Sequence, residues 1–132
     1  MNRRLRQRGF TLIELMVVIS IIVILLSLAI PNYSSSILHA KETALRDDLY
    51  TMRSLIDQYT LDKQKAPQSL QDLVDAGYLK QLPKDPFTNT RDSWVPVPDD
   101  SIMSPDQTEP GIIDVHSGSE QSSSEGTAYN TW

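Results

Sequence analysis

The side chain with the most unusual chemical setting in this sequence is a single carboxylate, Glu14. It lies four residues after Phe10, at the start of an apolar segment in which residues 15 to 30 carry no charge. An ionisable group inside a membrane segment costs several kcal/mol when it has no partner, so it indicates a partner or a function. The chemistry open to Glu14 is charge pairing, unless it lies near enough to the membrane surface to reach water.

The other residues that could do chemistry form no catalytic pattern. The histidines, His39 and His116, lie far apart in the chain and belong to no recognisable metal-binding or nucleophile motif. No glycine-rich phosphate loop occurs, and the chain has no cysteine. The sequence therefore predicts a protein that is not an enzyme and whose fold uses no disulfide.

Charge is distributed unevenly along the chain. Arg3, Arg4, Arg6 and Arg8 precede the apolar segment without any acid among them, and after Gly9 only eight basic residues remain against 17 acidic ones. Basic residues that flank a hydrophobic span stay on the cytoplasmic side, which predicts a cytoplasmic N-terminus and a translocated, acidic remainder. An acidic remainder also argues against nucleic acid as a partner, because binding to phosphates requires clusters of Lys and Arg.

Residues 1 to 31 are compatible with three kinds of membrane segment. A plain signal anchor needs about 20 apolar residues to span roughly 30 Å of hydrocarbon, and this segment has them. A removable signal peptide is the second kind, since the segment from Ser27 to Ala29 supplies a small-x-small pattern before Ile30. Neither of these gives Glu14 a role.

The third kind follows from a family resemblance. The segment Gly9 to Glu14, with a basic leader before it and an uncharged run after it, resembles the class III signal of type IV pilins and type II secretion pseudopilins. The resemblance implies that a prepilin peptidase cuts after Gly9, that the new N-terminal residue Phe10 is methylated, and that Glu14 becomes the fifth residue. Pro31 lies where such chains commonly carry a helix-kinking proline.

This resemblance offers a role for the carboxylate. After cleavage the α-amino group of Phe10 is a cation at the end of an apolar helix, and Glu14 of a neighbouring copy can neutralise it when helices stack into a fibre. An unpaired buried charge is heavily penalised while a paired one is tolerated, so such a pair acts mainly as a register device. The expected assembly residues are Phe10, Glu14 and Pro31.

The fold class predicted is α+β and pilin-like, with a long N-terminal helix packed on a small antiparallel β-sheet head. We expect a leader at residues 1–9, a membrane-spanning or filament-core helix at 10–31, an amphipathic half at 32–64 and a head at 65–132. In the amphipathic half an apolar stripe recurs at helical spacing, and residues 32–36 are polar enough to favour some unwinding after Pro31. The stripe consists of Leu38, Leu45, Leu49, Met52, Ile56 and Tyr59.

In the head, the pattern predicts a short helix, two strands and a long loop. Ser69 is the expected N-cap of a helix over residues 70–76 that Gly77 closes, residues 94–97 and 111–116 are the expected strands, and residues 98–110 the expected loop. The segment from Leu82 to Phe87, which includes Asp85 and Pro86, resembles the corresponding loop of major pseudopilins.

The C-terminal segment departs from that family. Major pseudopilins commonly bind calcium in a loop that carries two adjacent acids shortly before a terminal tryptophan, and here Ala128 and Tyr129 stand in place of the acids. Calcium prefers several oxygen ligands including carboxylates, and only Glu120 and Glu125 remain nearby. We therefore expect no metal, calcium included, and no other cofactor. Tyr129 and Trp132 are the expected anchors of this segment.

The resemblance implies a structural subunit of a pseudopilus. We expect a homopolymer that works with a prepilin peptidase, an assembly ATPase, a platform protein and minor pseudopilins. Before assembly it is expected in the lipid of the bacterial inner membrane, as a single-pass protein with a cytoplasmic N-terminus and a periplasmic head. Two alternatives remain open at this point: a type IV pilus subunit for adhesion, motility or electron transfer, and a membrane-anchored binding module.

Overall fold

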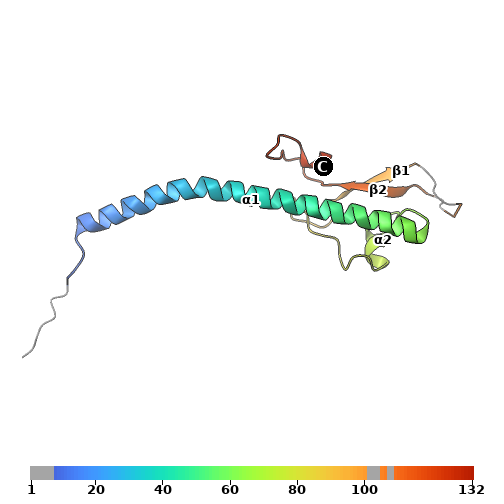
Figure 1. Ribbon diagram of the computed structural model, residues 1–132, viewed down its shortest axis with the longest axis horizontal. Helices are drawn as coiled ribbons and strands as arrows, with labels where there is room; N and C mark the ends of the chain where they lie inside the picture. The colour runs from blue at the N-terminus through green and yellow to red at the C-terminus, as the bar shows by residue number, and fades with distance from the viewer. Residues whose placement is uncertain (1–7, 101–104, 107–108) are drawn as a thin grey trace, which may run out of the picture. The chain divides into compact units, whose positions relative to one another are not determined.

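A computed structural model describes residues 8–100, 105–106 and 109–132 and has an α+β fold, which confirms the predicted class (Figure 1). The elements are helix α1 (Leu12–Lys63), helix α2 (Leu70–Asp75), strand β1 (Val95–Asp99), strand β2 (Gly111–His116) and the 3-10 helix η1 (Tyr129–Thr131). Arg3, Arg4, Arg6 and part of the predicted 98–110 loop lie outside the described residues. The chain divides into an N-terminal unit ending at Ile37 and a C-terminal unit, Leu38–Trp132.

Both ends of helix α1 carry features that are typical of helix ends. Thr11 caps its start, because its hydroxyl accepts a hydrogen bond from the Glu14 amide at 3.2 Å and its carbonyl accepts one from the Leu15 amide at 3.2 Å. After Lys63 the chain turns at Gln64, whose φ of 57° lies in the left-handed region that commonly ends helices. The predicted helix end near Lys63 is confirmed.

The predicted unwinding after Pro31 is wrong, because α1 runs without a break through residues 31–37. A proline in a helix has no N–H for the carbonyl four residues earlier, so one main-chain hydrogen bond is lost. Polar side chains on both sides of Pro31 bond back to carbonyls of the same helix: the Ser27 hydroxyl donates to the Ile24 carbonyl, and the Ser36 hydroxyl to the Asn32 carbonyl. Hydrogen bonds of this kind, from a serine hydroxyl to a carbonyl three or four residues earlier, are compatible with a continuous helix.

The apolar stripe of α1 forms one wall of the core of the C-terminal unit. Leu45, Met52 and Ile56 are at most 1% exposed, and they belong to one cluster with residues of α2, β2 and η1. This burial confirms that the stripe packs on its own head. The cluster comprises Leu45, Leu49, Met52, Ile56, Tyr59, Leu70, Leu73, Trp94, Ile112, Val115 and Tyr129.

The sheet is a two-stranded antiparallel pair whose register runs from Val95 opposite His116 to Asp99 opposite Gly111. Strand β1 extends two residues further than predicted, so residues 98 and 99 belong to the strand and not to the loop. The reason is that the register shifts between Val97 and Pro98, and a proline is tolerated at such an irregularity of an edge strand.

The start of β2 lies so close to Ala66 that a glycine is needed there. A Cβ atom on Gly111 would lie 2.2 Å from the Cβ of Ala66, so only glycine fits against this turn. The next residue, Ile112, donates its amide to the Pro67 carbonyl at 2.7 Å. The segment that follows α1 is thereby fastened to the sheet, and in Figure 1 the sheet and α2 lie on opposite sides of α1.

Helix α2 has the predicted N-cap and turn. The Asp72 carboxylate accepts hydrogen bonds from the amides of Gln68 at 2.8 Å and Ser69 at 3.2 Å, which ties the chain to the first turn. The helix ends at Asp75, one residue before the predicted end, and Gly77 turns the chain with a φ of 85°.

The core predicts a strong difference between two leucines of α1. Leu49→Ala removes a side chain that is 2% exposed and should lower the free energy of unfolding of the C-terminal unit by about 2–5 kcal/mol. Leu61→Ala, at a position 71% exposed, is the matched control and should change it by less than about 0.5 kcal/mol. Denaturant unfolding of the full chain in detergent measures both. Equal losses would contradict the assignment of the stripe to the core.

Candidate functional site

The predicted processing site is open to a partner. Gly9 and Phe10 precede α1 in non-helical chain, both are exposed, and the Phe10 side chain is 88% exposed. A Cβ atom added to Gly9 would meet no heavy atom within 4 Å, so packing within this chain does not require a glycine there. A requirement for glycine at position 9 would therefore come from another molecule.

Glu14 lies in the first turn of α1 and is exposed. A carboxylate in this position is stabilised by the partial positive charge of the helix N-terminus, although the effect is modest at an exposed site. The ion pairs among the described residues involve carboxylates other than Glu14. The exposed Glu14 carboxylate is therefore accessible from outside the helix.

The apolar side chains that follow Glu14 are exposed all around the helix. Between Leu12 and Ile30 the exposed fraction of the large hydrophobic residues ranges from 48% at Val18 to 83% at Leu12. An 18-residue window of α1 has a mean hydropathy of 3.0, so by length and composition this helix can cross a membrane. Such a surface is stable only when lipid or other apolar helices cover it. Pro31 lies just after this segment, within α1.

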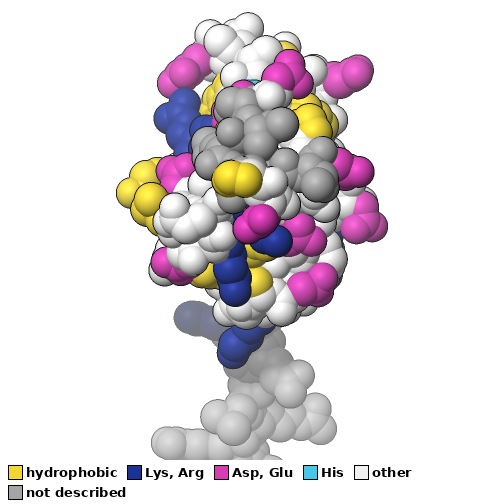
Figure 2. Space-filling model, turned by 90° about the vertical axis from the view of Figure 1, so that its right-hand side faces the viewer, with side chains coloured by type: hydrophobic (Ala, Val, Ile, Leu, Met, Phe, Trp, Pro, Cys, Tyr) yellow, Lys and Arg dark blue, Asp and Glu magenta, His cyan; other side chains and the backbone are white. Residues whose placement is uncertain are grey.

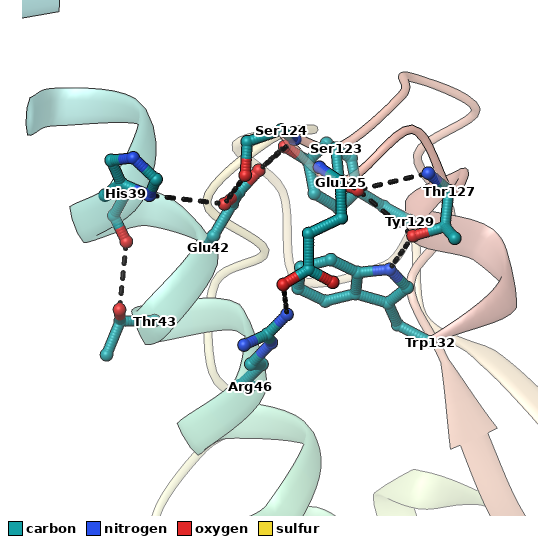
Figure 3. Close-up of polar contacts among 10 residues, drawn as sticks. All are labelled: His39, Glu42, Thr43, Arg46, Ser123, Ser124, Glu125, Thr127, Tyr129 and Trp132. Atoms are coloured by element: carbon teal, nitrogen blue, oxygen red, sulfur yellow. Dashed lines mark hydrogen bonds and ion pairs between the residues drawn. The ribbon is translucent and has the colours of Figure 1, made fainter. Parts of the chain in front are cut away.

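A second polar centre, which the sequence reasoning missed, lies where α1 meets the C-terminal loop, residues 117–128 (Figure 3). Its centre is Glu42, a residue of α1 that is only 6% exposed. Three donors reach its carboxylate: the Ser124 amide and the Ser124 hydroxyl, each at 2.7 Å, and the Tyr129 hydroxyl at 2.8 Å. His39 lies 3.8 Å from the same carboxylate.

The pKa values around Glu42 follow from these contacts. The hydrogen bonds from Ser124, first that of its amide and then that of its hydroxyl, lower the pKa of Glu42 below its ordinary value despite the opposing effect of burial. Burial and the neighbouring Glu42 carboxylate raise the pKa of Tyr129 to about 12. At neutral pH the pair is therefore a carboxylate that accepts from a neutral phenol.

The C-terminal loop is also held by contacts among its own residues and with Arg46 (Figure 3). The Arg46 guanidinium lies 3.3 Å from the Glu125 carboxylate and 4.4 Å from the ring centre of Trp132. The Trp132 indole N–H donates to the Thr127 hydroxyl at 2.9 Å. Tyr129 is fully buried and stacks on Phe87, which confirms it as an anchor, and Trp132 packs edge-on against Tyr129.

Strand β2 has a separate polar tie to α1 through Arg53. This guanidinium pairs with the Asp114 carboxylate and donates to the carbonyls of Val115 and Trp132, each at 2.9 Å. His116 lies beside the same Trp132 carbonyl. These contacts give Arg53 a structural role, because they tie α1 to β2 and to the C-terminal residue.

Over the described part of the chain, no group of three or more His, Asp or Glu side chains is placed to hold a metal ion. Figure 2 shows Asp and Glu side chains spread over the face in view, with fewer basic side chains among them. That distribution matches the acidic composition of the chain after Gly9.

Comparison with known proteins identifies the N-terminal motif and the family. Residues 4–30 match the model of the prokaryotic N-terminal methylation motif. The chain is 35% identical over 128 residues to the type II secretion system core protein G of Klebsiella pneumoniae, covering 85% of this chain and 84% of that protein. It is 38% identical to the core protein G of Escherichia coli K12 (64% and 69% covered) and 39% identical to that of Pseudomonas aeruginosa PAO1 (67% and 73% covered). No solved structure matches the chain.

The motif and the exposed apolar helix on a small α+β head define a pilin-like protein, which fits anchoring in the inner membrane. More narrowly, the chain belongs to the family of type II secretion system core protein G, the major pseudopilins. It is therefore a pseudopilin that assembles into a pseudopilus with the secretion machinery, and its relatives are structural proteins. The pilus-subunit and binding-module alternatives are not favoured.

The contacts of Glu42 predict how stability depends on pH. Because the folded state lowers the pKa of Glu42, its contribution is complete above the ordinary pKa of glutamate and is lost as the pH falls through the lowered value. The charged or titratable groups at this carboxylate are His39 and Tyr129. Glu42→Gln should therefore lower the melting temperature at neutral pH, by an amount that shrinks in acid.

The measurement is the melting temperature of both proteins from neutral to strongly acidic pH. Glu120→Gln, which neutralises an exposed carboxylate of the same loop, is the control and should follow the wild-type curve. A gap between Glu42→Gln and wild type that stays constant with pH would show that the charge of Glu42 is not what matters.

Proposed function

We propose that this pseudopilin is cut after Gly9, methylated at Phe10 and polymerised through its apolar helix into a fibre that drives protein export. The observation that carries the proposal is the apolar surface of residues 12–30, which is exposed on all sides and directly follows an accessible Gly9–Phe10 bond. The methylation motif, which covers residues 4–30, supports the same processing.

Lipid and neighbouring copies can cover this apolar surface in turn. The segment from Leu12 to Ile30 is roughly 28 Å long at 1.5 Å per residue, close to the hydrocarbon thickness of a bilayer. When the helix leaves the membrane, the same side chains need an equally apolar environment, and the helices of other copies provide it. We therefore propose a homopolymer whose core is made of residues 10–31.

Charge pairing at the start of the helix would set the register of this polymer. Cleavage after Gly9 creates an α-amino group on Phe10, and the exposed Glu14 carboxylate of a neighbouring copy is the matching anion. Without cleavage, the four leader arginines would have to enter the apolar fibre core, which is far more costly than one paired amine. Processing and pairing are thus two steps of one assembly mechanism.

The remaining partners and the topology follow from the same proposal. The leader arginines favour a cytoplasmic N-terminus and a periplasmic head in the inner membrane. A prepilin peptidase, an assembly ATPase, a platform protein and minor pseudopilins are the proposed partners. The subunit itself contributes packing surface and charge, and catalyses no reaction.

Processing is tested first by the intact mass and N-terminal sequence of the protein extracted from membranes of cells that express the full chain with a prepilin peptidase. We expect an N-terminus at Phe10 that carries one additional methyl group. Gly9→Val is the matched variant: it should stay uncut, and it should fold normally because the space around Gly9 is open. A free Ile30 or an intact Met1 in the wild type would refute the processing proposed.

The role of Glu14 is tested by Glu14→Gln, which removes the charge at nearly constant size. The unpaired Phe10 amine in the fibre core should reduce the yield of fibres by about tenfold or more, while cleavage and the level in the membrane stay unchanged. Glu14→Asp, which keeps the charge, is the control and should retain more assembly. The measurement is the amount of sheared fibre relative to total pseudopilin, and wild-type yields from Glu14→Gln would rule out the pairing.

A further inference from the structure

The C-terminal loop is where the major pseudopilin resemblance implies a calcium ion, and the residues present do not fit one. Calcium takes six to eight oxygen ligands, with carboxylates among them. Ala128 and Tyr129 occupy the positions of the expected acid pair, and Tyr129 is fully buried. Glu125 pairs with Arg46, and Glu120 is exposed.

Two further polar residues of this region, Asp114 in β2 and Ser117 just after it, also have protein partners. The Asp114 carboxylate pairs with Arg53, and the Ser117 hydroxyl donates to the buried Asp85 carboxylate at 2.6 Å. The loop hydroxyls are occupied as well, since Ser123 and Thr127 lie 3.0 Å apart and the Ser123 oxygen accepts from the amides of Glu125 and Thr127. The Asp114 carboxylate and these hydroxyls are therefore engaged within the protein.

We propose that the Glu42 carboxylate of α1 takes the place of a metal ion and holds the C-terminal loop of this pseudopilin without calcium. This inference goes beyond the proposed function, because fibre assembly through residues 10–31 requires no particular means of fastening the loop.

The loop presents hydrogen-bond donors at the point where it is fastened. The Ser124 amide, the Ser124 hydroxyl and the Tyr129 hydroxyl all converge on one carboxylate within 2.8 Å. A convergence of N–H and O–H donors binds an anion, whereas a calcium site requires a convergence of oxygen acceptors. In this chain the anion is a side chain of the helix on which the loop packs, so the fastening is intramolecular.

Glu42 can accept a hydrogen bond from residue 129 because a tyrosine stands there in place of an acid. Tyr129 occupies one of the acid positions, and its hydroxyl donates to Glu42 while its ring packs between Phe87 and Trp132. An acid in place of Tyr129 would put a second negative charge near Glu42 and would remove this packing. At the position of a metal ligand, Tyr129 thus supplies a hydrogen-bond donor to Glu42 and a buried ring for the core.

The first experiment is thermal unfolding of the mature full chain in detergent, followed by the fluorescence of Trp94 and Trp132, in excess EDTA and in millimolar calcium chloride. We expect the same melting temperature in both, within about 1 °C. A ligand present at 100 times its Kd would instead raise it by about 10 °C or more for a unit of this size. A rise of that kind in calcium would overturn the proposal.

The second part identifies the carboxylate that holds the loop. Glu42→Gln should lower the melting temperature by about 5–10 °C, equally in EDTA and in calcium, since two or three charge-assisted hydrogen bonds are weakened. Glu125→Gln is the matched control, because Glu125 is an exposed carboxylate of the loop and would be a ligand if calcium bound there. Its effect should stay within about 2 °C. The reverse order of sensitivity would refute the role of Glu42.

Two milder variants keep the test informative if Glu42→Gln fails to fold. Tyr129→Phe and Ser124→Ala each remove a hydroxyl that donates to Glu42 and leave the rest of the side-chain volume nearly unchanged. Each should make the C-terminal loop more sensitive to protease, severalfold over wild type, and calcium should not restore protection. Restored protection in calcium, or protection unchanged by both substitutions, would contradict the proposal.

Discussion

The C-terminal unit depends on the burial of one apolar stripe of α1. Five of the 11 residues in the core cluster of the described chain come from this helix, and the others come from short elements and a loop residue, Trp94, that could not form a core by themselves. A six-residue helix and a two-stranded sheet are marginal in isolation, so they are stable here because α1 supplies a long preformed surface. The head is therefore an addition to the helix rather than an independent domain.

Two charged residues of α1, the cation Arg53 and the anion Glu42, hold the head on this surface through polar contacts. Arg53 presents a cation to Asp114 and to the carbonyls of Val115 and Trp132, whereas Glu42 presents an anion to the donors of Ser124 and Tyr129. The two residues are 11 positions apart, about three turns of helix. Because acceptors meet the cation and donors meet the anion, these two contacts favour one direction of the C-terminal segment along α1. Apolar contacts alone would specify this direction poorly.

The sequence was sufficient for the features that depend on periodicity and on local stop signals. The spacing of Leu45, Met52 and Tyr59 located the core face of α1, and Ser69 and Gly77 located the short helix. The continuity of α1 after Pro31 was not predictable from helix propensity, because a proline and the polar residues 32–36 favour unwinding whereas the helix in the structure is continuous.

The centre at Glu42 was missed for a different reason. The stripe alternates steps of three and four residues, and the position between Leu38 and Leu45 in that series is residue 42. A carboxylate at a core position signals a buried partner network, but the partners, Ser124 and Tyr129, lie more than 80 residues away in the sequence. The place of Glu42 in the stripe was readable from the sequence, and the identity of its partners required the tertiary structure.

Glu42 and Glu14 lie on the same helix but differ in their surroundings. Glu42 is buried and its partners belong to its own chain, so its charge is used to complete the subunit. Glu14 is exposed in the first turn of an apolar segment and forms none of the ion pairs of the described residues, and in the proposed fibre its charge is used in contact with a neighbouring copy. A mutation at position 42 should therefore act on the stability of one molecule, whereas a mutation at position 14 should act on the association of many. This difference follows from where along α1 the head covers the helix.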